Sequence, residues 1–231
     1  MSMLDIALVV VIYIYVLALI FFAEQLRVRK GLPTTFTRRI IHLFASNAII
    51  ILPLFSSPIY PALLPIGLII LVTIAFMKRM PIIATSMVEE QDEVLHAYGP
   101  VYYMISILIL LFLFWEKPYI AMAATFVMSW GDGAATVVAK KLKRVHRYPF
   151  SNKSIEGTLA MFFFSFLGAL LAVSMGNMLG GFNLTMLQIL GSSLIAAAVG
   201  AITEALTLGP IRHFDNFTVP FASAFSMLLI V

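Results

Sequence analysis

Apolar segments of roughly 15 to 20 residues recur along almost the whole chain, with short polar stretches between them. An α-helix needs about 20 apolar residues to cross the hydrocarbon core of a bilayer, whereas a transmembrane β-strand needs only about 10 residues of alternating character. Only 11% of the 231 residues are charged, less than half of the fraction of about 25% that is usual for a soluble domain. We therefore predict an all-α fold, a polytopic helical bundle integral to the membrane that forms a single domain over residues 1–231.

Hydropathy predicts about eight membrane-spanning segments. They lie near Leu4–Ala23, Ile40–Phe55, Pro61–Met77, Val101–Trp115, Tyr119–Ala139, Thr158–Ser174, Leu187–Ala205 and Phe217–Val231. With the N-terminus outside, the inner loops hold 14 of the 15 lysine and arginine residues, and the outer side holds only Lys117. This asymmetry follows the positive-inside rule, so we expect the chemistry to take place on the cytoplasmic side.

The net charge of +4 has the same origin. Because the positive-inside pattern accounts for it, we expect membrane lipids as partners and no nucleic acid. The chain contains no cysteine, which excludes disulfides, thiolate metal sites and cysteine nucleophiles. It also contains no GxxxxGK[ST] loop, which excludes a Walker-type nucleotide site.

Asp132, in SWGDGAATVVAKK, is the strongest single candidate for chemistry. It lies in the predicted fifth span, where a carboxylate costs about 2.5–3.5 kcal/mol on insertion scales and needs a partner or a cation. The small residues Gly131, Ala135 and Ala139 form a stripe that lets a neighbouring helix approach closely. An aspartate that packs helices and pairs with a lysine is one interpretation; a metal ligand is the one we favour.

Two further acids are expected in the same cytoplasm-facing layer. Glu204 lies at the inner end of the predicted seventh span, and Asp215 is followed by Asn216 where the eighth begins. Three carboxylates without nitrogen or sulfur ligands suit Mg²⁺, which keeps several waters and usually also binds substrate phosphates. For Asp215 and Asn216, a role in capping the last helix is an equally good interpretation.

The loop KKLKRVHRYPFSNKSIEGT leads from the fifth span to the sixth and changes character along its length. Its first part, Lys140–Arg147, is a run of basic residues that we interpret as a topology signal touching anionic headgroups. Its second part is a turn with mixed polar groups at a helix N-terminus, an arrangement that can bind phosphate. The candidate phosphate ligands there are Lys153, Ser154, Glu156, Gly157 and Thr158.

Basic residues also open the predicted second span, in TRRIIHLF. Arg39 and His42 lie three residues apart and share a helix face, and arginine can bind a phosphate in bidentate fashion. From spacing alone, an interfacial anchor explains them better. The acidic stretch at Glu89–Glu93 could form an amphipathic helix on the membrane surface, and it signals a second metal site only weakly.

Four motifs together resemble the polyprenol kinase family. They are RRIIH at the second span, GDGAA in the fifth, NKSIEGTLAMF entering the sixth, and TEA followed by FDNFTVP at the end. The resemblance covers most of the chain in order and includes dolichol kinases, phytol kinases and a CTP-dependent diacylglycerol kinase. It implies an integral membrane kinase that transfers the γ-phosphate of CTP to a lipid alcohol, with a divalent cation.

The expected phosphoryl transfer needs positioning and charge neutralisation more than covalent catalysis. The acids would hold Mg²⁺, and either Asp132 or Asp215 could accept the proton of the hydroxyl. We expect a cell-membrane protein of a bacterium or an archaeon, with its active site on the cytoplasmic side. The alternatives are a CDP-lipid synthase related to phosphatidate cytidylyltransferases and, in a different class, an ion-coupled transporter. A transporter would place its acids near the bilayer midplane with polar groups on both sides, which this sequence lacks.

Overall fold

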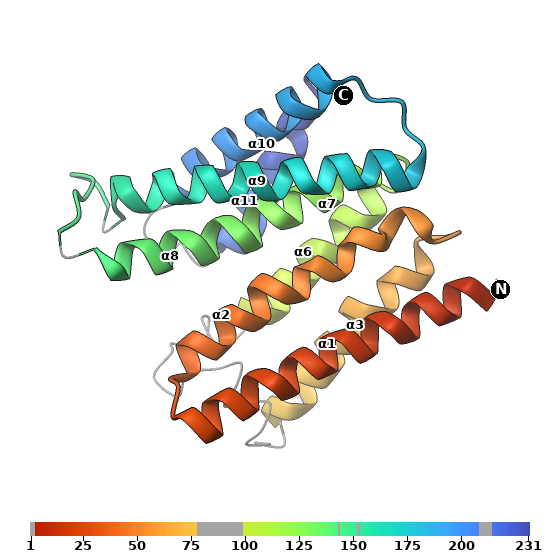
Figure 1. Ribbon diagram of the computed structural model, residues 1–231, viewed down its shortest axis with the longest axis horizontal. Helices are drawn as coiled ribbons and strands as arrows, with labels where there is room; N and C mark the ends of the chain where they lie inside the picture. Colours follow the sequence, from red (N-terminus) through yellow and green to blue (C-terminus); the bar gives the residue numbers. More distant parts are fainter. Residues whose placement is uncertain (1–2, 78–98, 143, 152, 208–213) are drawn as a thin grey trace. The chain divides into compact units, whose positions relative to one another are not determined.

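The computed structural model describes residues 3–77, 99–142, 144–151, 153–207 and 214–231. Its elements are helices, accompanied in the described residues by one isolated antiparallel bridge between Arg147 and Ser154 (Figure 1). The predicted all-α class is therefore confirmed. Contacts between Cα atoms divide the chain into two compact units. The first comprises Met1–Ala48 and Leu54–Leu113, and the second Ile49–Pro53 and Phe114–Val231.

The described residues of the first unit form four α-helices. These are α1 (Met3–Lys30), α2 (Thr34–Ala45), α3 (Ile59–Met77) and α6 (Gly99–Leu113), and a 3₁₀ segment η1 (Ser46–Leu54) follows α2. Helix α1 packs against α2 and α3, and α3 packs against α6. Two tyrosine hydroxyls of α1 fix these contacts by donating to main-chain carbonyls, Tyr13 to Leu63 at 2.5 Å and Tyr15 to Phe44 at 2.7 Å.

In the second unit, the part of the chain that the structure describes forms five α-helices and one π-helical turn. They are α7 (Pro118–Phe126), the π turn η2 (Val127–Gly131), α8 (Asp132–Lys141), α9 (Ile155–Gly180), α10 (Met186–Leu206) and α11 (Asp215–Met227). Helix α9 packs along α7, η2 and α8 on one side and α10 on another (Figure 1). Helix α11 packs against both α10 and α7, so the buried core of this unit lies between these helices.

Small residues bring the helices of the second unit into close contact, as predicted for Gly131. A Cβ on Gly131 would overlap the Ser165 hydroxyl of α9, and one on Gly200 would lie 2.5 Å from Val127 Cγ1. Ala135 is buried on the same helix, while the side chain of Ala139 lies outside the described residues. Close approach of backbones is how membrane helices commonly associate, because lipid offers no hydrophobic driving force between them.

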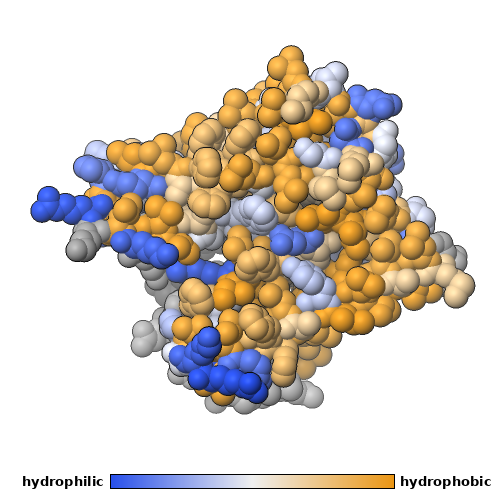
Figure 2. All heavy atoms as spheres, viewed as in Figure 1, coloured by the Kyte–Doolittle hydropathy of each residue, from blue (hydrophilic) through white to orange (hydrophobic). Residues whose placement is uncertain are grey.

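Each of the eight predicted segments coincides with helical structure, but the number of membrane crossings stays a prediction. Within the described residues, three helices are long and apolar enough to cross a membrane, namely α1, α9 and α10. The apolar stretches Arg39–Leu54, Ile59–Ile74 and Gly99–Leu113 are shorter. Large apolar side chains are exposed on many of the helices, and hydrophobic residues cover much of the face in Figure 2. Such a surface suits lipid rather than water. The orientation with the N-terminus outside also stays a prediction.

Candidate active site

Asp132 opens helix α8 at the point where the predicted fifth span is interrupted. The interruption is the π turn η2, in which hydrogen bonds join residues five apart instead of the four of an α-helix, and such turns are frequent at functional sites. The hydroxyl of Ser165 donates to the Val127 carbonyl at 3.0 Å and so satisfies an acceptor of this turn. Thr136 donates to the main-chain carbonyl of Asp132 at 3.0 Å. The interrupted helix therefore fixes the backbone from which the Asp132 carboxylate projects.

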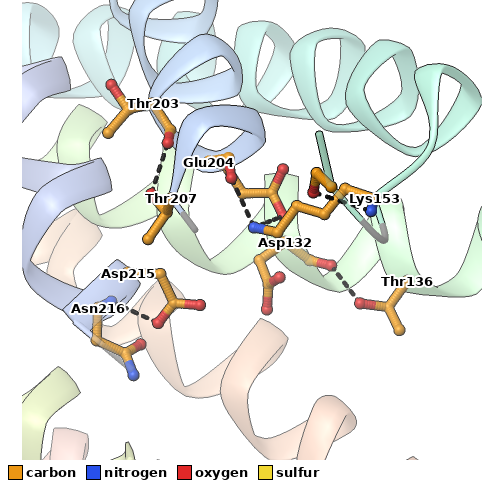
Figure 3. A network of polar contacts seen from close by, with 9 residues as sticks. Asp132, Thr136, Lys153, Thr203, Glu204, Thr207, Asp215 and Asn216 are labelled. Atoms are coloured by element: carbon orange, nitrogen blue, oxygen red, sulfur yellow. Dashed lines mark hydrogen bonds and ion pairs between the residues drawn. The ribbon is translucent and has the colours of Figure 1, made fainter. Parts of the chain in front are cut away.

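Glu204 and Lys153 form an ion pair beside Asp132 (Figure 3). Lys153 Nζ lies 2.5 Å from Glu204 Oε1 and also donates to the Glu204 main-chain carbonyl at 2.6 Å. The side chain of Glu204 is 13% exposed and that of Lys153 is 27% exposed. An acid paired with a lysine was the interpretation that we did not favour for Asp132; the structure shows such a pair at Glu204, where the sequence did not predict it.

Asp215 begins helix α11 and points toward the same cluster (Figure 3). Its Oδ1 accepts a hydrogen bond of 2.8 Å from the main-chain N–H of Asn216 in the first turn. Asp215 precedes the apolar part of α11, and burial raises the pKa of its carboxyl group to about 6, with the nearby Asp132 carboxylate acting in the same direction. Phe214 is the N-cap of this helix, so neither Asp215 nor Asn216 occupies the cap position.

The three predicted acids therefore come together from three helices, around one lysine. Asp132 interacts electrostatically with both Glu204 and Asp215, and Lys153 interacts with Glu204 and Asp215. Among the described residues, no group of three or more histidine, aspartate and glutamate side chains is arranged to hold a metal ion by itself. Mg²⁺, however, is commonly bound by one or two carboxylates together with phosphate oxygens and water. Asp132 and Asp215 fit that donor set, whereas the Glu204 carboxylate is engaged with Lys153; metal binding by all three stays a prediction.

The predicted phosphate loop is an ordered turn at the start of α9. Tyr148 N–H donates to the Lys153 carbonyl at 3.1 Å, and Ile155 N–H donates to the His146 carbonyl at 2.9 Å. The Ser154 hydroxyl caps α9 by accepting from the Gly157 N–H at 3.1 Å. These bonds hold the backbone on both sides of Lys153.

Other members of the predicted phosphate set have varied surroundings. The Glu156 carboxylate accepts the His146 N–H at 3.0 Å and lies 2.6 Å from His146 Nδ1. Gly157 is buried in the first turn of α9, and Thr158 Oγ1 is buried without a hydrogen-bond partner in the described structure. Ser154 and Glu156 thus have structural partners, and a phosphate role for any of these residues stays a prediction.

The remaining predicted residues lie elsewhere. Arg39 and His42 belong to α2 in the first unit, where the His42 ring packs against Tyr103 with centroids 4.3 Å apart. Their role in phosphate binding stays a prediction. The acidic stretch Glu89–Glu93 and its proposed amphipathic helix fall outside the described residues.

Sequence reasoning missed several features of this region, including a histidine–glutamate contact and a buried threonine. The contact between His146 and Glu156 was not predicted, because His146 lies within the run of basic residues that we interpreted as a topology signal. Thr218, one turn beyond Asp215 in α11, has a buried hydroxyl oxygen without a partner in the described structure. The one available signal for Thr218 was its spacing of three residues from Asp215, which places both on one helix face.

Comparison with known proteins shows that this chain is similar to several phytol kinases. It is 32% identical to the phytol kinase of Synechocystis over 214 residues, which cover 91% of this chain and 85% of that protein. It is 32% identical to a probable chloroplastic phytol kinase of wheat over 126 residues, which cover 54% of this chain and 41% of the wheat protein. Phytol kinase 1 of Arabidopsis is 23% identical over 92% of this chain and 72% of its own length.

The chain belongs to the phytol kinase family, as its extensive match to the cyanobacterial enzyme shows. This confirms the resemblance to polyprenol kinases. The chain matches less than half the length of the wheat relative. No family model matches the sequence, and no solved structure is significantly similar to it.

Proposed function

We propose that this protein is a lipid-alcohol kinase that transfers the γ-phosphoryl group of CTP to a membrane isoprenoid alcohol of the phytol or dolichol type. The observation that carries the proposal is the match to a phytol kinase over 91% of the chain. The cluster of Asp132, Glu204 and Asp215 around Lys153 supports it, because phosphoryl transfer depends on charge and positioning. CTP as the donor rests on the resemblance to polyprenol kinases.

In the proposed reaction, the hydroxyl oxygen of the alcohol attacks the γ-phosphorus of CTP. The bond between that phosphorus and the oxygen bridging to the β-phosphate breaks, and CDP leaves. The hydroxyl proton passes to a carboxylate, either Asp132 or Asp215. Lys153 and the turn at Gly157 and Thr158 would bind phosphate oxygens.

A divalent cation, most suitably Mg²⁺, would neutralise charge on the phosphates when it is bound. Asp132 and Asp215 are the residues that would hold it, because Mg²⁺ is commonly bound by one or two carboxylates together with phosphate oxygens and water. Their positions at the starts of two different helices make them a fixed pair, and Glu204 adds negative charge nearby.

The same proposal includes a cytoplasmic active site in the cell membrane of a bacterium or an archaeon. Its support is the location of 14 of 15 basic residues in the predicted inner loops. A lipid alcohol can reach such a site laterally within the bilayer, while CTP arrives from the aqueous side. In sealed vesicles of known orientation, we expect CTP to support the reaction only from the cytoplasmic face. Equal activity with external nucleotide would contradict the assigned sidedness.

The decisive experiment is a labelling assay with the purified protein in detergent. The protein is incubated with Mg²⁺ and phytol, geranylgeraniol or dolichol, using CTP labelled at either the α- or the γ-phosphorus, with γ-labelled ATP in parallel. We expect γ label from CTP in the lipid product. Label from the α-phosphorus would instead indicate a CDP-lipid synthase, and ATP outperforming CTP would overturn the proposed donor.

A further inference from the structure

Two parts of one residue hold the ammonium group of Lys153. Glu204 Oε1 lies 2.5 Å from Lys153 Nζ, and the Glu204 main-chain carbonyl accepts a hydrogen bond of 2.6 Å from the same nitrogen. Glu204 lies in the last turn of α10, and Lys153 lies just before α9. The contact therefore joins the C-terminal end of one helix to the N-terminal end of its neighbour (Figure 3).

Hydrogen bonds fix both the main chain of Lys153 and the carbonyl group that binds its ammonium group. Its main-chain carbonyl accepts from Tyr148 N–H at 3.1 Å, and its N–H donates to Ser151 Oγ at 3.1 Å. The Glu204 carbonyl that binds the ammonium also accepts from Thr207 N–H at 3.3 Å, so the end of α10 holds it in place. A lysine has a flexible four-carbon side chain. Because these contacts already restrict its conformation, less conformational entropy is lost when the ammonium group binds a ligand.

An ammonium group has three hydrogen-bond donors, and Glu204 receives two of them. Lys153 remains partly exposed, and it interacts electrostatically with Asp215 across the cluster. It is thus positioned with donor capacity left, beside the two carboxylates that suit a phosphate-bound cation.

We propose that Glu204 is a positioning residue that holds the Lys153 ammonium in place for the phosphates of the nucleotide, and that it is not a ligand of the metal ion. This inference rests on the proposed function. The ammonium group lies against the Glu204 carboxylate, so a divalent cation bound to the same carboxylate would be repelled by it at short range.

The test compares Glu204→Gln with the matched control Glu116→Gln, which makes the same substitution at an exposed glutamate of the second unit. Three quantities are measured: equilibrium binding of CTP in the absence of alcohol, KM for CTP against kcat, and the Mg²⁺ concentration for half-maximal rate. We expect E204Q to weaken CTP binding and raise KM about fivefold or more, with half-saturation by Mg²⁺ unchanged. We expect E116Q to match the wild type in all three.

The second arm is a double-mutant cycle with Lys153→Ala. If Glu204 acts through Lys153, adding E204Q to K153A should change CTP binding less than about twofold, because the partner is already gone. A shift of Mg²⁺ half-saturation in E204Q that persists in the K153A background would overturn the inference and make Glu204 a metal ligand. Additive losses of CTP binding would overturn it too.

Two further outcomes are informative. If E204Q lowers thermal stability but leaves CTP binding and KM unchanged, the ion pair is a structural link only and the inference is wrong. If E204Q does not fold, Glu204→Asp replaces it, since the shorter side chain keeps the charge and draws it away from Lys153. A wild-type protein that binds CTP but phosphorylates no alcohol would contradict the proposed function, while the CTP-binding cycle would still decide the role of Glu204.

Discussion

Buried carboxylates occur in both units of the molecule, and their surroundings differ. In the first unit, Asp5 is 1% exposed and both of its oxygens accept hydrogen bonds from Ser56. The Ser56 N–H binds Oδ1 at 2.9 Å, and the Ser56 hydroxyl binds Oδ2 at 2.7 Å. This acid joins the start of α1 to the segment before α3 and thereby has a sufficient structural explanation.

In the second unit, three carboxylates form one cluster, and the Lys153 ammonium group pairs with one of them, Glu204. With all three acids ionised, the four described side chains of this cluster, Asp132, Glu204, Asp215 and Lys153, carry a formal charge of −2 among themselves (three negative, one positive). Excess like charge in a partly buried site is costly unless a cation or a ligand balances it. The comparison teaches that burial alone does not mark a functional acid, because the buried Asp5 is explained by its hydrogen bonds to Ser56 alone, whereas the acids of the second unit cluster from three helices.

The largest expected effect comes from neutralising Asp132, the acid that interacts with both other acids of the cluster. Asp132→Asn keeps the shape of the side chain and removes its charge, and a neutral amide is easier to insert into the membrane. We expect less than about a tenth of wild-type phosphorylation, with expression and folding close to normal. The measurement is lipid phosphorylation per folded protein, and retention of a larger fraction would remove Asp132 from metal binding and catalysis.

Asp5→Asn is the matched substitution in the other unit. It replaces one acceptor with an amide donor that faces a donor of Ser56, so we expect the free energy of unfolding to fall by about 1–3 kcal/mol. Activity per folded molecule should stay at the wild-type level. Loss of activity without loss of stability would break the distinction between the two kinds of acid.

The contrast between these regions was only partly accessible from sequence. Apolar run lengths predicted the helices that the structure describes, and the choice of Asp132, Glu204 and Asp215 as a group followed from their common depth. The π turn before Asp132 was not predictable, because a local change in the spacing of main-chain hydrogen bonds leaves the hydropathy of the segment unchanged. The pair between Lys153 and Glu204 was also missed, because 51 residues separate them and the packing of α9 on α10 brings them together.

Removing the Lys153 ammonium group should have the next largest effect. Lys153→Ala is expected to raise KM for CTP by an amount equivalent to about 1.5–3 kcal/mol, the loss of one charge-assisted phosphate contact. The measurement is KM for CTP at saturating alcohol and Mg²⁺. An unchanged KM would show that the lysine only balances the acids.

Asp215→Asn tests whether Asp215 binds Mg²⁺ together with Asp132 or is only an acid in the first turn of a helix. We expect it to raise the Mg²⁺ concentration for half-maximal rate several-fold, on the order of 3- to 10-fold, because a carboxylate oxygen is a better ligand for Mg²⁺ than an amide. Magnesium titrations at fixed CTP measure this shift. A curve superimposable on that of the wild type would return Asp215 to a local role in the first turn of α11.

The smallest effect is expected at Arg144, a basic residue of the same loop as Lys153. Arg144 is exposed, and we interpret its run of basic residues as a topology signal, whereas Lys153 is held beside the acids by Glu204. Because exposed charges interact weakly through water, Arg144→Ala should change kcat/KM for CTP by well under about 1 kcal/mol. The assay is the one used for Lys153→Ala, so the two substitutions differ only in whether the cation belongs to the cluster. An effect at Arg144 as large as that at Lys153 would mean that the whole basic loop binds the nucleotide by its summed charge, and the anchored position of Lys153 would lose its special significance.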